Sequence, residues 1–195
     1  MERAPAWVRL CLAGLVLLAW SVAAAPTGQT IQLRRDTTDV DLAPTIRYVH
    51  DLTAQGDLSA AMQWLDEGRF QPLPGGRTSL GFQGGAYWLH VRVVNRDNPE
   101  THWLLVQHYA LSDRIDVHVR DADGRIAFQA GGDHVPFAAR SIRYRHPNFL
   151  LTLPRNEPVD VFVRVQSESS MQLPLSLHTM SAFAETTRDA QFVIG

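Results

Sequence analysis

Residues 87–95 alternate between two kinds of side chain, and this pattern constrains the fold more than any other part of the sequence. Successive side chains of a β-strand point to opposite faces, so the pattern predicts a strand whose two faces differ. One face carries Leu89, Val91 and Val93 and suits a hydrophobic core. The other face carries Trp88, His90 and Arg92. An aromatic ring, an imidazole and a guanidinium bind polar ligands well, so this second face is a candidate binding face.

Further short segments show the same period of two, with turn residues between them. They are residues 103–109, 114–120, 125–130, 148–153, 159–165 and 171–177, with weaker candidates at 31–33 and 46–52. Seven or eight short strands at nearly regular spacing predict an all-β chain, folded as an antiparallel sandwich or barrel. Asn98-Pro99 predicts a hairpin between the first two strong strands, and Asp123-Gly124 predicts another after residue 120.

One short helix near the N-terminus interrupts the strand pattern. Asp57 has the side chain of a typical helix N-cap. The apolar residues after it recur with the spacing i, i+3, i+4 and i+7, which places them on one helical face. They are Leu58, Ala61, Met62 and Leu65. We expect this helix to end at Gly68.

The first 25 residues have the three parts of a secretory signal peptide. Arg3 and Arg9 form a basic start, residues 10–20 form a short apolar run, and residues 21–25 are small. An uncleaved membrane anchor is the alternative, although the apolar run is shorter than the roughly 20 residues of a spanning helix. The only cysteine, Cys11, lies in this segment, so the exported chain would have no disulfide and no thiol site. These features predict a periplasmic protein, with residues 26–43 as a flexible leader before the folded domain.

Composition and motifs argue against several classes of function. The charge is near neutral, with 18 basic and 20 acidic residues, so no basic field is available for nucleic acid. Every basic residue is arginine, which excludes a lysine base or Schiff base. The sequence has no GxSxG, HExxH or phosphate-loop motif, and its eight histidines lack a compact metal-ligand spacing. We therefore expect a non-catalytic domain without cofactor or metal; a hydrolase that uses Asp116 and Asp160 as paired acids is the alternative.

The candidate binding face extends beyond one strand. His118 and Arg120 could extend it from a second strand, and the irregular segment 140–146 could form the rim of a groove. The predicted ligand-binding residues are Trp88, His90, Arg92, His118, Arg120, Arg140 and Tyr144. Trp88 could instead be a core residue beneath the helix, and Arg140 could instead pair with Asp133 to fix a loop. Aromatic rings and arginine forks suit a carbohydrate or a carboxylate ligand.

An ordered series of short motifs runs through residues 44–183. It consists of Trp88 to Asn95, Trp103-Leu104-Leu105, Leu111, Ile115, Val117, Gly132-Asp133, Pro136, Arg140, Phe149-Leu150-Leu151, residues 161–165, residues 167–170 and a leucine-rich strand. In this order the chain resembles the type-2 extracellular domain of the 7TMR-DISM receptors, which are bacterial seven-transmembrane receptors with diverse intracellular signalling modules.

The resemblance implies a periplasmic sensor domain with a jelly-roll β-sandwich fold like that of carbohydrate-binding modules. It also implies a parent receptor in the inner membrane, with attached transmembrane helices and commonly a diguanylate cyclase or histidine kinase output. Residues 183–189 form a polar tail of helical character. Residues 184–195, which end in an apolar stretch, would then connect the domain to the first transmembrane helix.

Three other functions stay open at this point. The chain could be a stand-alone carbohydrate-binding or adhesion module, a periplasmic hydrolase, or a structural dimerisation domain. A homodimer is compatible with the sensor function as well.

Overall fold

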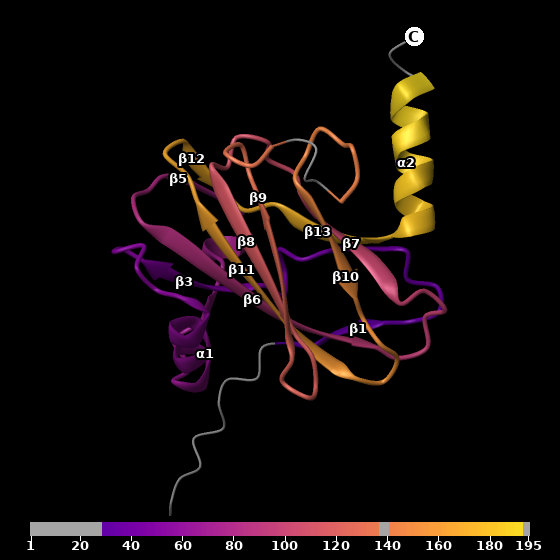
Figure 1. Cartoon of the computed structure of the whole chain (residues 1–195), viewed down its shortest axis with the longest axis horizontal. Coiled ribbons are helices and arrows are strands. Elements are labelled where there is room, and N and C mark those ends of the chain that lie inside the picture. The colour runs from indigo at the N-terminus through magenta and orange to yellow at the C-terminus, as the bar shows by residue number, and fades with distance from the viewer. Residues whose placement is uncertain (1–28, 137–140, 193–195) are drawn as a thin grey trace, which may run out of the picture.

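The alternating segment forms β6 (Ala86–Asn95), which lies inside the larger of two packed sheets (Figure 1). The computed structural model describes residues 29–136 and 141–192. The other strands of this sheet are β1 (Ile31–Leu33), β3 (Arg47–Asp51), β4 (Gln71–Pro72), β8 (Arg114–Arg120), β9 (Ile126–Gly131) and β11 (Pro158–Gln166). Their order is β4-β3-β6-β11-β8-β9, and β1 pairs with β6 in parallel.

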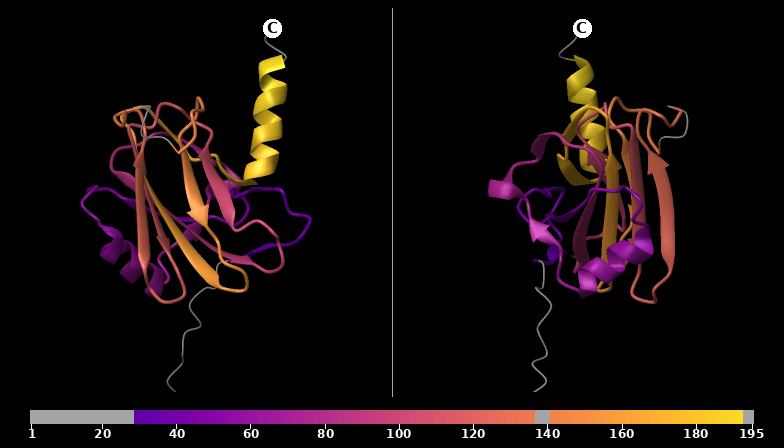
Figure 2. Two further views of the ribbon diagram at one scale, coloured as in Figure 1. Left: turned by 45° about the vertical axis from the view of Figure 1, so that its right-hand side comes forward. Right: turned by 90° about the vertical axis from the view of Figure 1, so that its left-hand side faces the viewer.

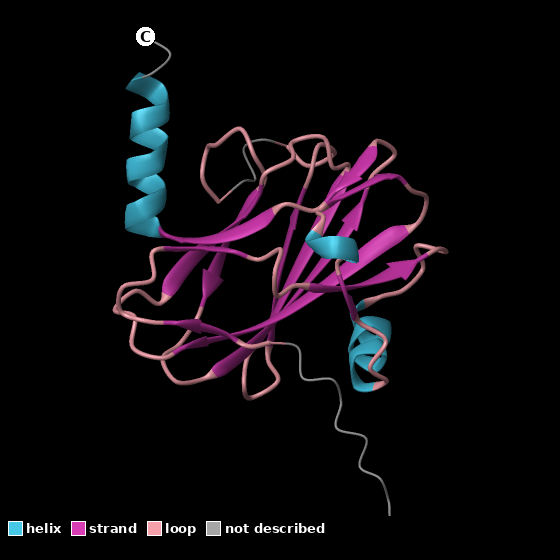
Figure 3. Ribbon diagram, turned by 180° about the vertical axis from the view of Figure 1, so that it is seen from behind, coloured by secondary structure: helices cyan, strands magenta, loops and turns pink. Residues whose placement is uncertain are grey.

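A smaller sheet packs against the first, and a short two-stranded sheet and two α-helices complete the fold. The four strands of the smaller sheet are, in spatial order, β10 (Asn148–Thr152), β7 (His102–Gln107), β13 (Leu175–Thr179) and β2 (Asp39–Asp41). The two-stranded sheet joins β12 (Ser170–Gln172) to β5 (Ser79–Phe82). The helices are α1 (Leu58–Asp66) and α2 (Met180–Phe192), with one 3-10 turn at Pro74–Gly76. Figure 3 shows that strands dominate the described chain, which confirms the all-β sandwich.

The main core lies between the two large sheets. The alternation along β6 is confirmed, because Leu89, Val91 and Val93 are all buried in this core. β11 contributes Val159, Val161, Val163 and Val165 to the same core. The smaller sheet contributes Trp103, Leu105, Phe149, Leu151, Leu175 and Leu177. Because apolar residues alternate with polar ones along the strands, each sheet has one apolar face, and the two apolar faces pack against each other.

The helix α1 covers part of the outer face of the larger sheet (Figure 2). Its N-cap is Asp57, whose carboxylate accepts a 2.9 Å hydrogen bond from the amide of Ala60. The predicted apolar stripe packs against Val49, Phe70, Trp88 and Phe162. Gly68 follows the helix in the left-handed region at φ 70°, as expected of a residue that ends a helix. The sequence therefore predicted both the limits and the buried face of α1.

The hairpin prediction at Asp123-Gly124 is confirmed, but the one at Asn98-Pro99 is wrong. β8 and β9 pair antiparallel, whereas β6 and β7 belong to different sheets. The connection between β6 and β7 crosses from one sheet to the other, and asparagine side chains anchor it. Asn98 donates to the carbonyl oxygens of Arg34 and Thr37 at 2.6 and 2.8 Å, and Asn95 accepts from the amide of Asn98 at 2.9 Å.

Two other segments differ from expectation. The strand expected at residues 171–177 is divided into β12 and β13 around Pro174, whose nitrogen cannot donate to a ladder. Within the expected leader, the weaker strand candidate at residues 31–33 is present as β1, whereas the paired strand β2 was not expected. The expected signal peptide lies outside the described residues.

The C-terminal helix α2 projects beyond the sandwich (Figure 2). Phe183 anchors its first turns against Leu104 and Val106 on the outer face of the smaller sheet. Within the described residues, no helix has the length and apolar character needed to cross a membrane.

Candidate functional site

The polar side chains predicted to share one face do so, because neighbouring strands of the larger sheet are in register. Three rows cross the outer face: Trp88, Arg164 and Asp116; His90, Phe162, His118 and Phe128; and Arg92, Asp160 and Arg120. β11 lies between β6 and β8, so Arg164, Phe162 and Asp160 separate the two predicted groups of ligand-binding residues. This face therefore contains two different polar arrangements.

The first arrangement is a closed cluster around Asp160. Its carboxylate, on a residue that is 8 % exposed, accepts hydrogen bonds from His90 Nε2 at 2.9 Å and from Arg92 Nε and Nη2 at 2.9 and 2.8 Å. Burial raises the pKa of Asp160, but the hydrogen bonds from His90 and Arg92 outweigh this effect and hold the pKa well below its usual range. His90 and Arg92 thus direct hydrogen-bonding groups at Asp160 within the sheet.

The second arrangement is open and forms a pocket of about 640 Å³, beside the N-terminus of α1. Its wall is the segment 53–58, and its floor comes from the outer face of the larger sheet. The floor residues are Trp88, Arg114, Asp116, His118, Phe128, Arg164 and Gln166. A volume of this order accommodates a small organic ligand.

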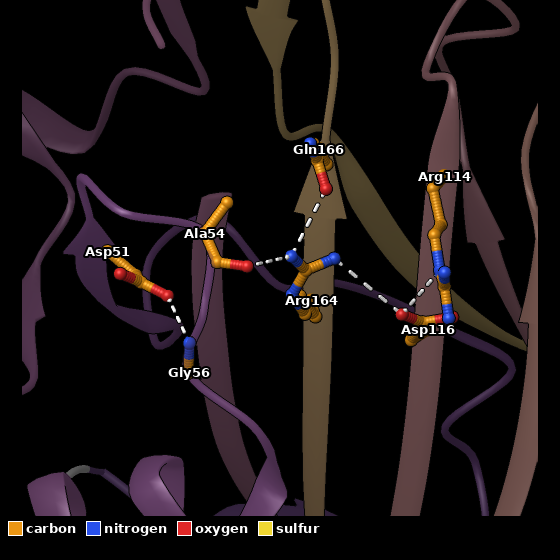
Figure 4. Close-up of polar contacts among 7 residues, drawn as sticks. All are labelled: Asp51, Ala54, Gly56, Arg114, Asp116, Arg164 and Gln166. Carbon is orange, nitrogen blue, oxygen red and sulfur yellow. Dashed lines mark hydrogen bonds and ion pairs between the residues drawn. The ribbon is translucent and has the colours of Figure 1, made fainter. Parts of the chain in front are cut away.

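Buried polar contacts hold the wall of the pocket in place (Figure 4). Asp51 accepts hydrogen bonds from the amide of Gly56 at 2.7 Å and from the amide and hydroxyl of Thr53 at 3.1 and 2.7 Å. Arg164 donates to the carbonyl oxygen of Ala54 at 2.9 Å, which ties the wall to the middle of the sheet. A Cβ at Gly56 would lie 2.4 Å from the ring of Trp64 on α1, so the close approach of wall and helix requires glycine.

Charged groups line the floor of the pocket (Figure 4). Asp116, which is buried, accepts from Arg114 Nε at 3.0 and 2.9 Å and lies 3.7 Å from Nη1 of Arg164. Arg164 also donates to Oε1 of Gln166 at 3.1 Å. The side chain of Arg114 is 59 % exposed, whereas that of Arg164 is 11 % exposed. Arg114 is therefore the more accessible of the two cations.

Aromatic rings form the apolar part of the floor. The ring of His118 lies 5.8 Å from that of Trp88, in a stacked arrangement, and 4.8 Å from that of Phe128. Burial lowers the pKa of His118, against the opposing effect of Asp116, and so favours the neutral imidazole. The indole Nε1 of Trp88 is buried and has no hydrogen-bond partner among the described residues. A buried donor of this kind costs free energy until it is satisfied.

The structure places the seven predicted ligand-binding residues in different surroundings. Trp88 and His118 line the pocket, and Trp88 also packs beneath α1. His90 and Arg92 bind Asp160 outside the pocket lining, and Arg120 lies 4.0 Å from the sulfur of Met62. Tyr144 packs with Phe183 beside the smaller sheet, and Arg140 lies outside the described residues.

Sequence reasoning did not include several lining residues among the ligand-binding ones, namely Arg114, Asp116, Phe128, Arg164, Gln166 and the segment 53–58. Alternation along β8 already placed Arg114 and Asp116 on the face of His118, so the signal was present. In the described part of the chain, no group of three or more histidines and acids is arranged to hold a metal ion.

The model of the family 7TMR-DISM extracellular 2 matches residues 43–179, and the chain belongs to this family. No curated protein shows significant sequence similarity to the chain. Family membership makes the sandwich an extracellular sensor domain of a membrane receptor, and it implies attached transmembrane helices and a periplasmic location.

Proposed function

We propose that this domain senses a small polar ligand in the periplasm and that the ligand binds in the pocket between segment 53–58 and the outer face of the larger sheet. The pocket itself is the observation that carries the proposal. It combines an exposed arginine, a buried indole donor and aromatic rings on a rigid sheet. Such a combination of apolar walls and a few oriented polar groups is typical of small-molecule sites.

Ligand binding would act on the parent receptor by favouring one of two states of the attached membrane helices, which requires a different affinity for each state. The resemblance to 7TMR-DISM receptors favours a diguanylate cyclase or a histidine kinase as the output. Of the two carboxylates considered for a hydrolase, Asp116 lines the pocket and Asp160 does not, so they do not face a common substrate space. This arrangement favours binding over hydrolysis.

A thermal-shift screen tests the proposal with neutral monosaccharides, amino acids and organic acids at millimolar concentration. A ligand present at 100 times its Kd stabilises the native state by about 2.7 kcal/mol, which raises the Tm by about 5–10 °C for a domain of this size. Phe128→Ala should reduce the shift, because Phe128 lines the pocket. Ile126→Ala is the matched control, since Ile126 is an exposed apolar residue of the same strand outside this pocket.

Two results would contradict the proposal. One is the absence of any shift across the panel. The other is a shift that Phe128→Ala and Ile126→Ala leave equally large, because the ligand would then bind elsewhere.

A further inference from the structure

Four oxygen acceptors on the floor and wall of the pocket already form hydrogen bonds or ion pairs within the protein. Both carboxylate oxygens of Asp116 accept from Arg114, and one also lies near Arg164. The carbonyl oxygen of Ala54 and the Oε1 atom of Gln166 both accept from Arg164. These four oxygen atoms are therefore less available to a ligand that is rich in donors.

In contrast to these acceptors, hydrogen-bond donors of the floor remain free, within the described part of the chain, to bind a ligand. Among the described residues, the side chain of Arg114 makes hydrogen bonds through Nε alone, and its two Nη atoms belong to a side chain that is 59 % exposed. The Nε1 of Trp88 also has no partner among the described residues, but this atom is buried, so Arg114 is the donor that the pocket exposes. The floor therefore offers donors to a ligand that supplies acceptors.

The net charge of the floor also favours a ligand that supplies acceptors, because it is positive. Arg114 and Arg164 share a single carboxylate, that of Asp116, which leaves one positive charge in excess on the floor. The other acidic side chain that lines the pocket, Asp57, belongs to the wall and caps the first turn of α1 through the amide of Ala60. The two Nη atoms of a guanidinium can bind both oxygens of a carboxylate in one plane.

We propose that the ligand of this pocket carries a carboxylate group and that Arg114 binds this group through its Nη atoms; this assignment rests on the function proposed above. It narrows the ligand from polar molecules in general to organic acids, a class that includes uronic acids and amino acids. His118 and Phe128 then contact the body of the ligand, since they form the apolar part of the floor.

Matched pairs of acids and their primary amides test this assignment by isothermal titration calorimetry on the purified chain. Suitable pairs are glucuronate with glucuronamide, glutamate with its diamide, and lactate with lactamide. We expect at least one acid to bind, and we expect its amide to bind more weakly by a factor of about ten or more, because the amide lacks the charge that strengthens the hydrogen bonds.

Arg114→Gln should weaken binding of the acid about tenfold and leave the amide almost unchanged. Arg120→Gln is the matched control, since Arg120 lies at the other end of β8 on the same face and does not line the pocket. Arg114→Gln also removes a charged partner of the buried Asp116, so the Tm of each variant is measured and binding is compared at a temperature at which both variants are folded.

The possible failures separate the two proposals. If neutral compounds bind as well as acids, and Phe128→Ala weakens their binding, the carboxylate assignment is wrong and the ligand pocket stands. If acids bind but Arg114→Gln has no more effect than Arg120→Gln, the role of Arg114 is wrong. If no compound of either type binds, both proposals fail.

Discussion

Replacing Asp160 by asparagine should destabilise the domain by about 2–3 kcal/mol, because its carboxylate is the common acceptor for two cationic or ionisable side chains. Removing one partner of a fully buried ion pair costs about 3–5 kcal/mol. We place this case lower, since the side chain of Arg92 is 49 % exposed and regains water when it loses the carboxylate. The amide of the variant would still accept one hydrogen bond, but through a neutral oxygen. The corresponding decrease in Tm is about 4–12 °C.

Urea titrations and calorimetry of wild type and Asp160→Asn measure this cost. The matched control is Glu67→Gln, because Glu67 forms a half-exposed ion pair with Arg69 at 3.6 Å and should contribute less than about 1 kcal/mol. Since the folded-state pKa of Asp160 is lowered, its contribution is present above the ordinary pKa of 3.8 and is lost as the pH falls through the folded-state pKa. The reasoning would be refuted if Asp160→Asn cost no more than Glu67→Gln at neutral pH.

Three further predictions concern stability. Gly85→Ala should destabilise the domain by at least about 2 kcal/mol in urea titrations, since Gly85 has φ 85° and a Cβ there would lie 2.4 Å from the carbonyl oxygen of Asp51. Gly84→Ala is the control, because Gly84 has open space around it, and should change stability by less than about 0.5 kcal/mol. Equal costs for the two variants would contradict this prediction. Asp57→Ala should cost about 1 kcal/mol through the lost N-cap of α1, and an unchanged Tm would count against it. Burial lowers the pKa of His108 and His178, so the unfolded chain binds more protons than the folded chain, and stability should fall as the pH drops below the ordinary histidine pKa of 6.5. His178→Gln should weaken this pH dependence in thermal unfolding, and a pH profile identical to that of wild type would show that His178 does not contribute.

The sequence was sufficient to assign side chains to faces. A strand has a period of two, so Leu89 and Trp88 had to point in opposite directions once β6 was recognised. The helix α1 could also be predicted from the sequence, because its N-cap Asp57 and its apolar stripe are local signals.

The neighbours of each strand in the sheet could not be predicted in this way, because alternation carries no information about which strands pair. Asp160 meets His90 across 70 residues of sequence, and Arg164 meets Ala54 across 110. These contacts depend on β11 lying between β6 and β8, and that order follows from the crossing of the chain between sheets. This is why the sequence did not reveal that His90 and Arg92 bind Asp160, and why it did not reveal the pocket wall at residues 53–58.

The indole proton of Trp88 offers the most direct test of the ligand pocket. Two-dimensional ¹H–¹⁵N spectra of the chain resolve tryptophan indoles, and Trp88→Phe and Trp103→Phe assign the two buried ones. The Nε1 of Trp103 donates to the carbonyl oxygen of Glu100 at 3.1 Å, so it serves as an internal reference. During titration with a ligand that calorimetry shows to bind, we expect the Trp88 signal to move and the Trp103 signal to stay in place. A saturating ligand that leaves the Trp88 signal unchanged would contradict this expectation.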